Sequence, residues 1–180
     1  MTSGSETPRL FVAVWPPAPV VAALAALPRG DAPGVVWEPP DLAHITLRYL
    51  GPCEVEAAVA AMTRLRASAA TAVLGPEVVM LGPSVVCVPV TGLDHLASDV
   101  LAVTAGLGQP PTHDRFTGHL TVARVRRNAA CTLVGHAVAG SFGVTSVALV
   151  RSHLSNASQP VRRYETLATF AVGGTPTSDH

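Results

Sequence analysis

The stretch HITL at residues 44–47 recurs as HLTV at residues 119–122. Both read histidine, apolar residue, threonine, apolar residue, and both lie in segments with the composition of a β-strand. Side chains i and i+2 of a strand point to the same face, so each histidine shares a face with its threonine. The apolar residues of each copy point the other way, into a core. The repeated pattern predicts two strands, each with a polar front and an apolar back, that face one another across a cleft.

The segments around the two copies favour an α+β fold with antiparallel sheet, because hairpin turns between apolar runs are mixed with longer helical segments. We expect one domain over residues 9–172, with two similar lobes, and loose tails at 1–8 and 173–180. Strands are predicted over residues 10–15, 44–50, 73–80, 85–90, 117–125, 142–152 and 163–172, and helices over 19–27, 54–70, 94–107 and 128–139.

Composition limits the classes of function. The chain has 180 residues, of which 48% are hydrophobic, so it is not intrinsically disordered. Its 12 basic and 12 acidic residues balance, which argues against a broadly basic nucleic-acid binder and still allows a local phosphate pocket. Every basic residue is arginine. Chemistry that needs a lysine is therefore excluded, whereas planar binding of phosphate by a guanidinium remains open.

Other common site types have no support in the sequence. Cys53, Cys87 and Cys131 are far apart and form no CxxC pair, which argues against a disulfide framework or a zinc site. No histidines show the HxH or HExxH spacing of a metal site, and the aspartates are scattered. The longest suspicious apolar run, residues 20–27, is far shorter than the roughly 20 residues of a membrane span. We expect a cytoplasmic, monomeric protein without a metal or a cofactor.

Two histidines and two threonines in one cleft suit phosphoryl chemistry. An imidazole with a pKa of about 6.5 can take a proton from water or give one to a leaving oxygen near neutral pH. Threonine hydroxyls can donate hydrogen bonds to the non-bridging oxygens of a phosphate. Together these groups fit an in-line displacement at phosphorus in which positioning and charge stabilisation supply most of the catalysis.

The paired motifs resemble those of the 2H phosphoesterase superfamily, and more narrowly those of the bacterial RNA 2′,3′-cyclic phosphodiesterases, also called 2′-5′ RNA ligases. RLFVA at 9–13, HITLRYLG at 44–51 and FTGHLTVAR at 116–124 are similar to that family's first strand and two motifs. SHL at 152–154 and YETL at 164–167 resemble its closing hairpin. Gly118 departs from the pattern, since the family usually has proline there, and we expect a looser approach to His119.

The resemblance implies a two-lobed α+β fold with antiparallel sheets around a central cleft and helices on the outside. It implies that the enzyme opens a 2′,3′-cyclic phosphate on RNA or a nucleotide to leave a 2′-phosphate, without metal. His44 and His119 would be the acid–base pair, with His119 favoured as the base, although the sequence does not assign these roles. Thr46 and Thr121 would bind the phosphate oxygens, and Arg124 would be a further phosphate ligand.

Strand alternation bears on three further residues near the motifs. Strand alternation puts Arg48 on the face of His44 and makes it a candidate substrate ligand, as is Tyr49, an aromatic of the cleft wall on which a base could stack. The same alternation turns Arg124 away from Thr121 unless its strand bends. Two other functions remain open: formation or cleavage of 2′-5′ RNA linkages, and binding of nucleotide or RNA without catalysis.

Overall fold

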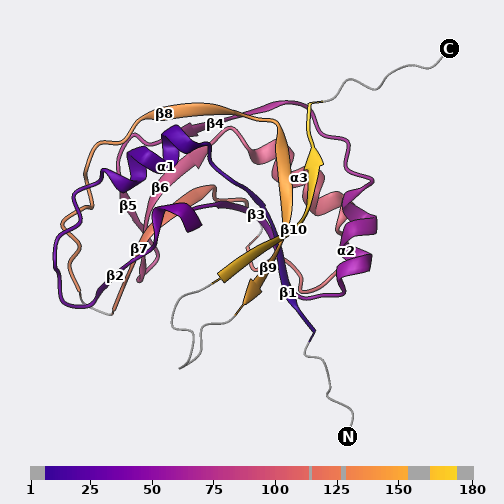
Figure 1. Cartoon of the computed structure of the whole chain (residues 1–180), viewed down its shortest axis with the longest axis horizontal. Coiled ribbons are helices and arrows are strands. Elements are labelled where there is room, and N and C mark those ends of the chain that lie inside the picture. The colour runs from indigo at the N-terminus through magenta and orange to yellow at the C-terminus, as the bar shows by residue number, and fades with distance from the viewer. Residues whose placement is uncertain (1–6, 114, 127–128, 154–162, 174–180) are drawn as a thin grey trace, which may run out of the picture.

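The strands form two antiparallel sheets (Figure 1). The computed structural model describes residues 7–113, 115–126, 129–153 and 163–173. The first sheet has four strands in the order β10-β9-β1-β3. Its members are β1 (Arg9–Val14), β3 (Ile45–Pro52), β9 (Ser146–His153) and β10 (Arg163–Ala171). His44 directly precedes β3, which carries the rest of the first motif at the edge of this sheet, and β1 is paired on both sides.

The second sheet carries the second motif. Its strands run in the order β2-β7-β6-β4-β8, and β5 pairs with β6 outside that path. The strands are β2 (Val35–Trp37), β4 (Ala70–Leu74), β5 (Val79–Leu81), β6 (Val85–Thr91), β7 (His119–Val125) and β8 (Gly140–Val144). In Figure 1 this sheet curves into an arch in the left half of the view, beside the sheet that holds β1, β9 and β10.

Helices cover the sheets from outside. They are α1 (Ala18–Ala25), the 3-10 turn η1 (Pro40–Leu42), α2 (Val55–Met62) and α3 (Asp94–Val103). Each α-helix buries one side only, as the fully buried Leu24, Met62 and Val100 show. The predicted α+β class, with antiparallel sheets and helices outside, is confirmed. No helix among the described residues is long and apolar enough to cross a membrane.

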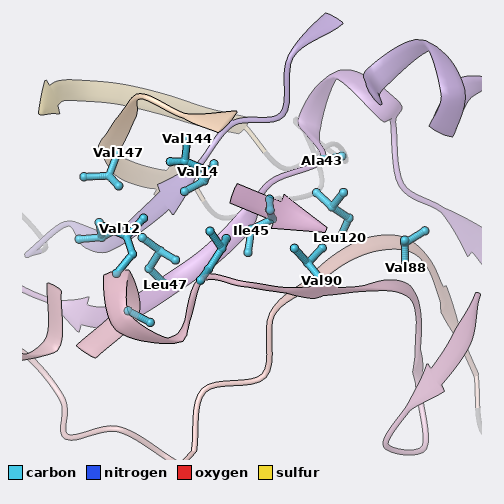
Figure 2. Packing of buried hydrophobic residues seen from close by; sticks show 14 of the residues in the cluster. Val12, Val14, Ala43, Ile45, Leu47, Val88, Val90, Leu120, Val144 and Val147 are labelled. Atoms are coloured by element: carbon cyan, nitrogen blue, oxygen red, sulfur yellow. The ribbon is translucent and has the colours of Figure 1, made fainter. Parts of the chain in front are cut away.

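One hydrophobic core joins the two sheets. Ile45 on β3 and Leu120 on β7 are both completely buried and belong to the same cluster, which Figure 2 shows together with Val12, Val90 and other residues of that cluster. The apolar backs of the two motif strands therefore anchor both motifs to a common core, as alternation predicted. A smaller apolar cluster, formed by Phe11, Ala13, Ala148 and Val150, is separate from this core.

The predicted helix 54–70 is too long. Helix α2 ends at Met62, where the Oγ1 of Thr63 donates hydrogen bonds to the carbonyls of Val59 and Ala60. The backbone N–H of Thr63 also donates to the Val59 carbonyl, so the hydroxyl adds a partner for the last carbonyls at the end of the helix. Residues 70–74 form β4 instead. Helix α3 is also shorter than predicted, and it ends where Thr104 Oγ1 donates to the carbonyl of Val100.

The predicted strand 73–80 is interrupted. Strand β4 ends at Leu74, and β5 begins only at Val79. Gly75 between them has a φ of 98°, and a Cβ there would lie 1.9 Å from the carbonyl oxygen of Val138. Only glycine tolerates that backbone and that approach, so the chain turns here and leaves the strand.

Two further predictions are wrong. The predicted strand 142–152 is two strands, because the chain passes from β8 to β9 at Thr145 and so from one sheet to the other. The predicted helix 128–139 is absent over residues 129–139, which form a turn whose carbonyl at His136 accepts from the N–H of Val78. Position 128 and the predicted tails at 1–6 and 174–180 lie outside the described residues.

Candidate functional site

The two motifs meet at one cavity of about 180 Å³. His44 and Thr46 line it from the first sheet, and His119 and Thr121 line it from the second. All four side chains are only partly buried, whereas the apolar residues between them are buried. The cavity therefore brings together the four polar side chains on which the sequence prediction rests.

Both histidines are held in the same way. The Nδ1 atom of His44 lies 2.8 Å from the carbonyl oxygen of Leu42, and the Nδ1 atom of His119 lies 2.8 Å from that of Thr117. A carbonyl oxygen only accepts hydrogen bonds, so Nδ1 carries the proton in each ring. The Nε2 atom of each imidazole is then the one that can gain or lose a proton during a reaction.

Aromatic rings surround His44. The centroids of Tyr164, Phe11 and Trp15 lie 4.8, 5.0 and 5.4 Å from that of the imidazole. Burial among these rings lowers the pKa of His44 from its ordinary value of 6.5, because desolvation penalises the charged form. The Leu42 carbonyl and Glu38 oppose this shift, while His119 and Arg124 add to it.

A β-bulge interrupts each motif strand at the same place. In β3 the pairing passes from Thr46 to Arg48, so Leu47 has no partner on β1. In β7 it passes from Thr121 to Ala123, so Val122 has no partner on β6. A bulge adds one residue to one strand and shifts the alternation of every side chain beyond it. Both bulges fall three residues after the histidine.

The bulges decide which later residues reach the cavity. Tyr49 and Arg124, each five residues after its histidine, both line it. Arg124 thus lies with Thr121, as the resemblance implied and as simple alternation did not. Arg48 does not line this cavity: it is 7% exposed, and its Nη2 donates a hydrogen bond to the carbonyl of Gln109. The bulge turns Arg48 away from the cavity of His44, contrary to simple alternation, and Arg48 lines a second cavity together with Thr46 and Tyr49. Its role as a substrate ligand stays a prediction.

A second, larger cavity of about 510 Å³ adjoins the first. Thr46, Tyr49 and His119 line both cavities. Arg115 and Phe116, from the segment before β7, belong to the lining of the second one. The two cavities therefore share a wall that carries one of the two motif histidines.

One carboxylate lies inside the site. The Nε of Arg124 donates a hydrogen bond of 2.8 Å to Oε1 of Glu38, and both residues line the first cavity. Glu38 follows β2, which pairs with β7, and its backbone N–H donates to the carbonyl of Val122. Sequence reasoning did not identify Glu38, since no motif includes it.

Five other lining residues were missed as site residues: Phe11, Leu42, Ala43, Ser152 and Tyr164. Phe11 could have been found, because alternation along β1 places it with Ala13 on one face, opposite Val12. Ser152 and Tyr164 come from paired positions of β9 and β10, and only knowledge of that pairing brings them to the motifs.

Gly118 is packed tightly, contrary to the looseness expected there. A Cβ at this position would lie 2.4 Å from the carbonyl oxygen of Val90 and 3.1 Å from the ring of Phe116. The carbonyl of Gly118 also accepts a 2.9 Å hydrogen bond from the N–H of Val90. Glycine at this position lets β6 come close to the residue before His119.

The remaining candidate groups are unconnected with this site. Cys53 and Cys87 are buried and unpaired, and burial raises the pKa of Cys87 to about 11. Over the described ranges, no three or more His, Cys, Asp and Glu side chains are grouped as metal ligands would be. His153, which follows a strand pattern like that of the motifs, lies on the surface beside Glu165.

The fold is similar to that of several solved structures. E. coli LigT complexed with NADP+ superposes with a TM-score of 0.74 at 23% identity, covering 94% of this chain and all of that one. TT0787 of Thermus thermophilus has a TM-score of 0.71 at 28% identity, covering 92% of this chain and 98% of that one. A structure described as a phosphoesterase has a TM-score of 0.72 at 24% identity, with 94% and 100% covered. The sequence matches no protein-family model and no curated protein.

Proposed function

We propose that this chain hydrolyses 2′,3′-cyclic phosphate ends of RNA or nucleotides to a 2′-phosphate. Its fold is that of the 2H phosphoesterases, which agrees with the resemblance of the motifs and supports this proposal. The observation that carries the proposal is the pair of imidazoles in one cavity, each fixed by an Nδ1 hydrogen bond to a carbonyl two residues earlier. Two proton carriers held alike are needed for acid–base catalysis and are not needed for binding alone.

The reaction follows from these groups. A water molecule attacks the phosphorus in line with the bond to the 3′ oxygen, and the Nε2 of one imidazole takes the proton of that water. As the P–O3′ bond breaks, the Nε2 of the other imidazole gives its proton to the 3′ oxygen. Ring opening leaves a phosphate on the 2′ oxygen and a free 3′ hydroxyl, so protons and bonds balance.

The other lining residues would hold the phosphate. The hydroxyls of Thr46 and Thr121 can donate to its non-bridging oxygens, one from each sheet. Arg124 uses its Nε for Glu38 in the hydrogen bonds of the described residues, which leaves the two Nη atoms for the phosphate. These preorganised donors would stabilise the charge that grows on the oxygens at the transition state.

The adjoining cavity supports a nucleotide substrate. It begins at Thr46 and His119, has room for a nucleoside, and carries Tyr49 and Phe116 as surfaces on which a base can stack. Solved structures of E. coli LigT contain 3′-AMP, ATP, NADP+ or phosphate, which supports a phosphate-bearing nucleotide as ligand in this fold.

Hydrolysis of an RNA oligonucleotide with a 2′,3′-cyclic phosphate end, in the presence of EDTA, tests the proposal. We expect the native chain to form the 2′-phosphate, and His44→Ala and His119→Ala to be at least about a hundredfold slower. His153→Ala is the matched control, because this histidine is also on a strand but lies outside the cavity.

Three results would contradict the proposal. Activity that depends on added metal would exclude the metal-free mechanism. Binding of the RNA with an unopened ring would indicate a binding module. Activity on 2′-5′-linked RNA alone would reassign the same histidine pair to that linkage.

A further inference from the structure

We infer that Glu38 sets the charge selectivity of the phosphate cavity, so that the cavity prefers a singly charged cyclic phosphodiester to a doubly charged phosphomonoester. The inference rests on the proposed function, and it concerns the step after catalysis, when the product leaves. Glu38 would act through the charge it places beside Arg124 rather than on the reacting atoms.

The first observation is the charge of the lining. Among the described residues that line the cavity, only Glu38 and Arg124 carry a fixed charge, and these two cancel. The remaining titratable groups able to become positive are His44 and His119. In the form ready for catalysis, with one imidazole protonated as the acid, the lining carries a single net positive charge.

That single charge matches the substrate and not the product. A cyclic phosphodiester carries one negative charge at neutral pH. The monoester formed on ring opening carries about −1.5 to −2, because its second pKa is about 6. A cavity with both Arg124 and an uncompensated second cation would bind the product more tightly than the substrate. Glu38 removes that excess positive charge.

The second observation is how firmly Glu38 is held. Its side chain is 19% exposed, compared with 42% for Arg124. Its backbone N–H donates a hydrogen bond of 3.0 Å to the carbonyl of Val122. Its own backbone carbonyl accepts a hydrogen bond of 3.0 Å from Nη1 of Arg29. The guanidinium of Arg29 also lies over the Trp37 ring, 5.6 Å from its centroid. These contacts hold the backbone of Glu38 on both sides, and the hydrogen bond from Arg124 holds its carboxylate in the cavity lining.

The third observation is the geometry of the pair. Glu38 takes the Nε–H of Arg124, so it orients the guanidinium without occupying the Nη atoms that would meet a phosphate. Orientation and charge are two separate effects of this one side chain. Glu38→Gln keeps an oxygen that can accept from Nε and removes only the charge. Glu38→Ala removes both.

Binding measurements separate the effects without any turnover. Titration of the native protein and of Glu38→Gln with 2′-AMP and with inorganic phosphate, at a pH where both are mostly dianions, reports affinity for the monoester. We expect Glu38→Gln to bind each roughly tenfold more tightly. Glu38→Asp keeps the charge and should bind within about twofold of the native protein. Glu38→Ala should bind less tightly than Glu38→Gln, because Arg124 loses its acceptor.

Glu165→Gln is the matched control. Glu165 also accepts from an arginine, with 3.2 Å between its Oε2 and Nη1 of Arg151, and it does not line the cavity. This variant should leave binding of both anions unchanged. Equal affinity of the native protein and Glu38→Gln for 2′-AMP would overturn the inference, provided that thermal melting shows both folded. If Glu38→Gln does not fold, the comparison uses the other two variants. Glu38→Asp keeps the negative charge and should bind 2′-AMP and phosphate less tightly than Glu38→Ala does. The reverse order would overturn the inference.

Hydrolysis supplies an independent readout. For the cyclic substrate, Glu38→Gln should show product inhibition by 2′-AMP at about tenfold lower concentration than the native enzyme. If the native chain hydrolyses no cyclic phosphate and yet the binding difference appears, the proposed function fails and the charge selectivity stands. If hydrolysis occurs and the variant's affinity for 2′-AMP is unchanged, the selectivity fails alone.

Discussion

Tyr49 and Arg124 occupy the same position of the two motifs, five residues after the histidine, and both line the same cavity from opposite sheets. Each gets there because a bulge two residues earlier shifts the alternation of its strand. Equivalent positions of the two motifs thus supply different chemistry: an aromatic surface with 44% of Tyr49 exposed on one side, and a cation on the other.

Arg124→Ala should weaken phosphate binding. A hydrogen bond to a charged group contributes about 1.5–3 kcal/mol, so the dissociation constant for inorganic phosphate should rise roughly ten- to hundredfold. Isothermal titration checks this. Arg126→Ala is the matched control, since Arg126 is exposed just beyond the end of the same strand and does not line the cavity. An equal loss in both variants would mean that general positive charge, and not the placed guanidinium, holds the phosphate.

Arg48 should contribute to the stability of the fold and not to phosphate binding. Its buried guanidinium donates to the Gln109 carbonyl, so Arg48→Met leaves a carbonyl without its partner and should lower the free energy of unfolding by about 1–3 kcal/mol. Denaturant unfolding measures this loss. Because Arg48 lines the adjoining cavity and not the phosphate cavity, the affinity of Arg48→Met for inorganic phosphate should stay close to native, whereas Thr46→Val should lower that affinity. A large loss of phosphate affinity in Arg48→Met with native stability would place Arg48 among the phosphate ligands.

Sequence alone predicted the parts of this site that follow from strict alternation. The pattern over residues 44–47 and 119–122 gave the shared face of each histidine and threonine and the buried backs at Ile45 and Leu120. Alternation failed beyond the bulges, where Arg48 lines the adjoining cavity and not that of His44. A bulge depends on how the neighbouring strand pairs, which a single strand's residues do not specify.

Contacts between distant parts of the chain also explain why some elements and site residues were predicted wrongly. The break at Gly75 depends on the carbonyl of Val138, which approaches from a distant part of the chain. Glu38 was missed because 86 positions of sequence separate it from its partner Arg124. Only the pairing of β2 with β7 brings the two residues together. Local propensity predicts elements well and does not predict contacts of this range.

Gly118→Ala should destabilise the protein and impair His119. The added Cβ would lie 2.4 Å from the Val90 carbonyl oxygen, so the strands must separate, at a cost of about 1–3 kcal/mol. Thermal melting and kcat/KM measure the two effects. Gly140→Ala is the control, because nothing lies within 4 Å of a Cβ at that position. If both variants melt alike, the close approach of β6 at Gly118 has no energetic consequence.

Stability should fall as the pH is lowered, in part through His44. Burial puts the pKa of His44 in the folded protein below its ordinary value of 6.5, so between these two values the unfolded chain binds more protons than the folded one. The contribution of His44 is therefore complete above pH 6.5 and is lost as the pH falls through the folded value. Urea unfolding from about pH 8 to about pH 5 should show a smaller decline for His44→Gln than for the native protein.

His153→Gln is the control for this series. His153 is exposed on β9, outside the cavity, and its removal leaves the buried imidazole in place. Its decline with pH should exceed that of His44→Gln. Identical declines in the native protein and His44→Gln would show that the buried imidazole does not contribute to the pH dependence.

The position of β1 in its sheet determines at what length a growing chain can complete that sheet. This strand is synthesised before either of its neighbours: it pairs on one side with β3 and on the other with β9, which starts only at Ser146. A nascent chain that has reached Val125 carries the two motif histidines and still lacks β9, the second neighbour of β1. It also lacks Ser152 and Tyr164 of the cavity wall. Because neither sheet is one uninterrupted stretch of sequence, folding cannot finish lobe by lobe during translation. A message cut short after the second motif would therefore yield a chain with every proposed acid–base group and no finished site in which to use them.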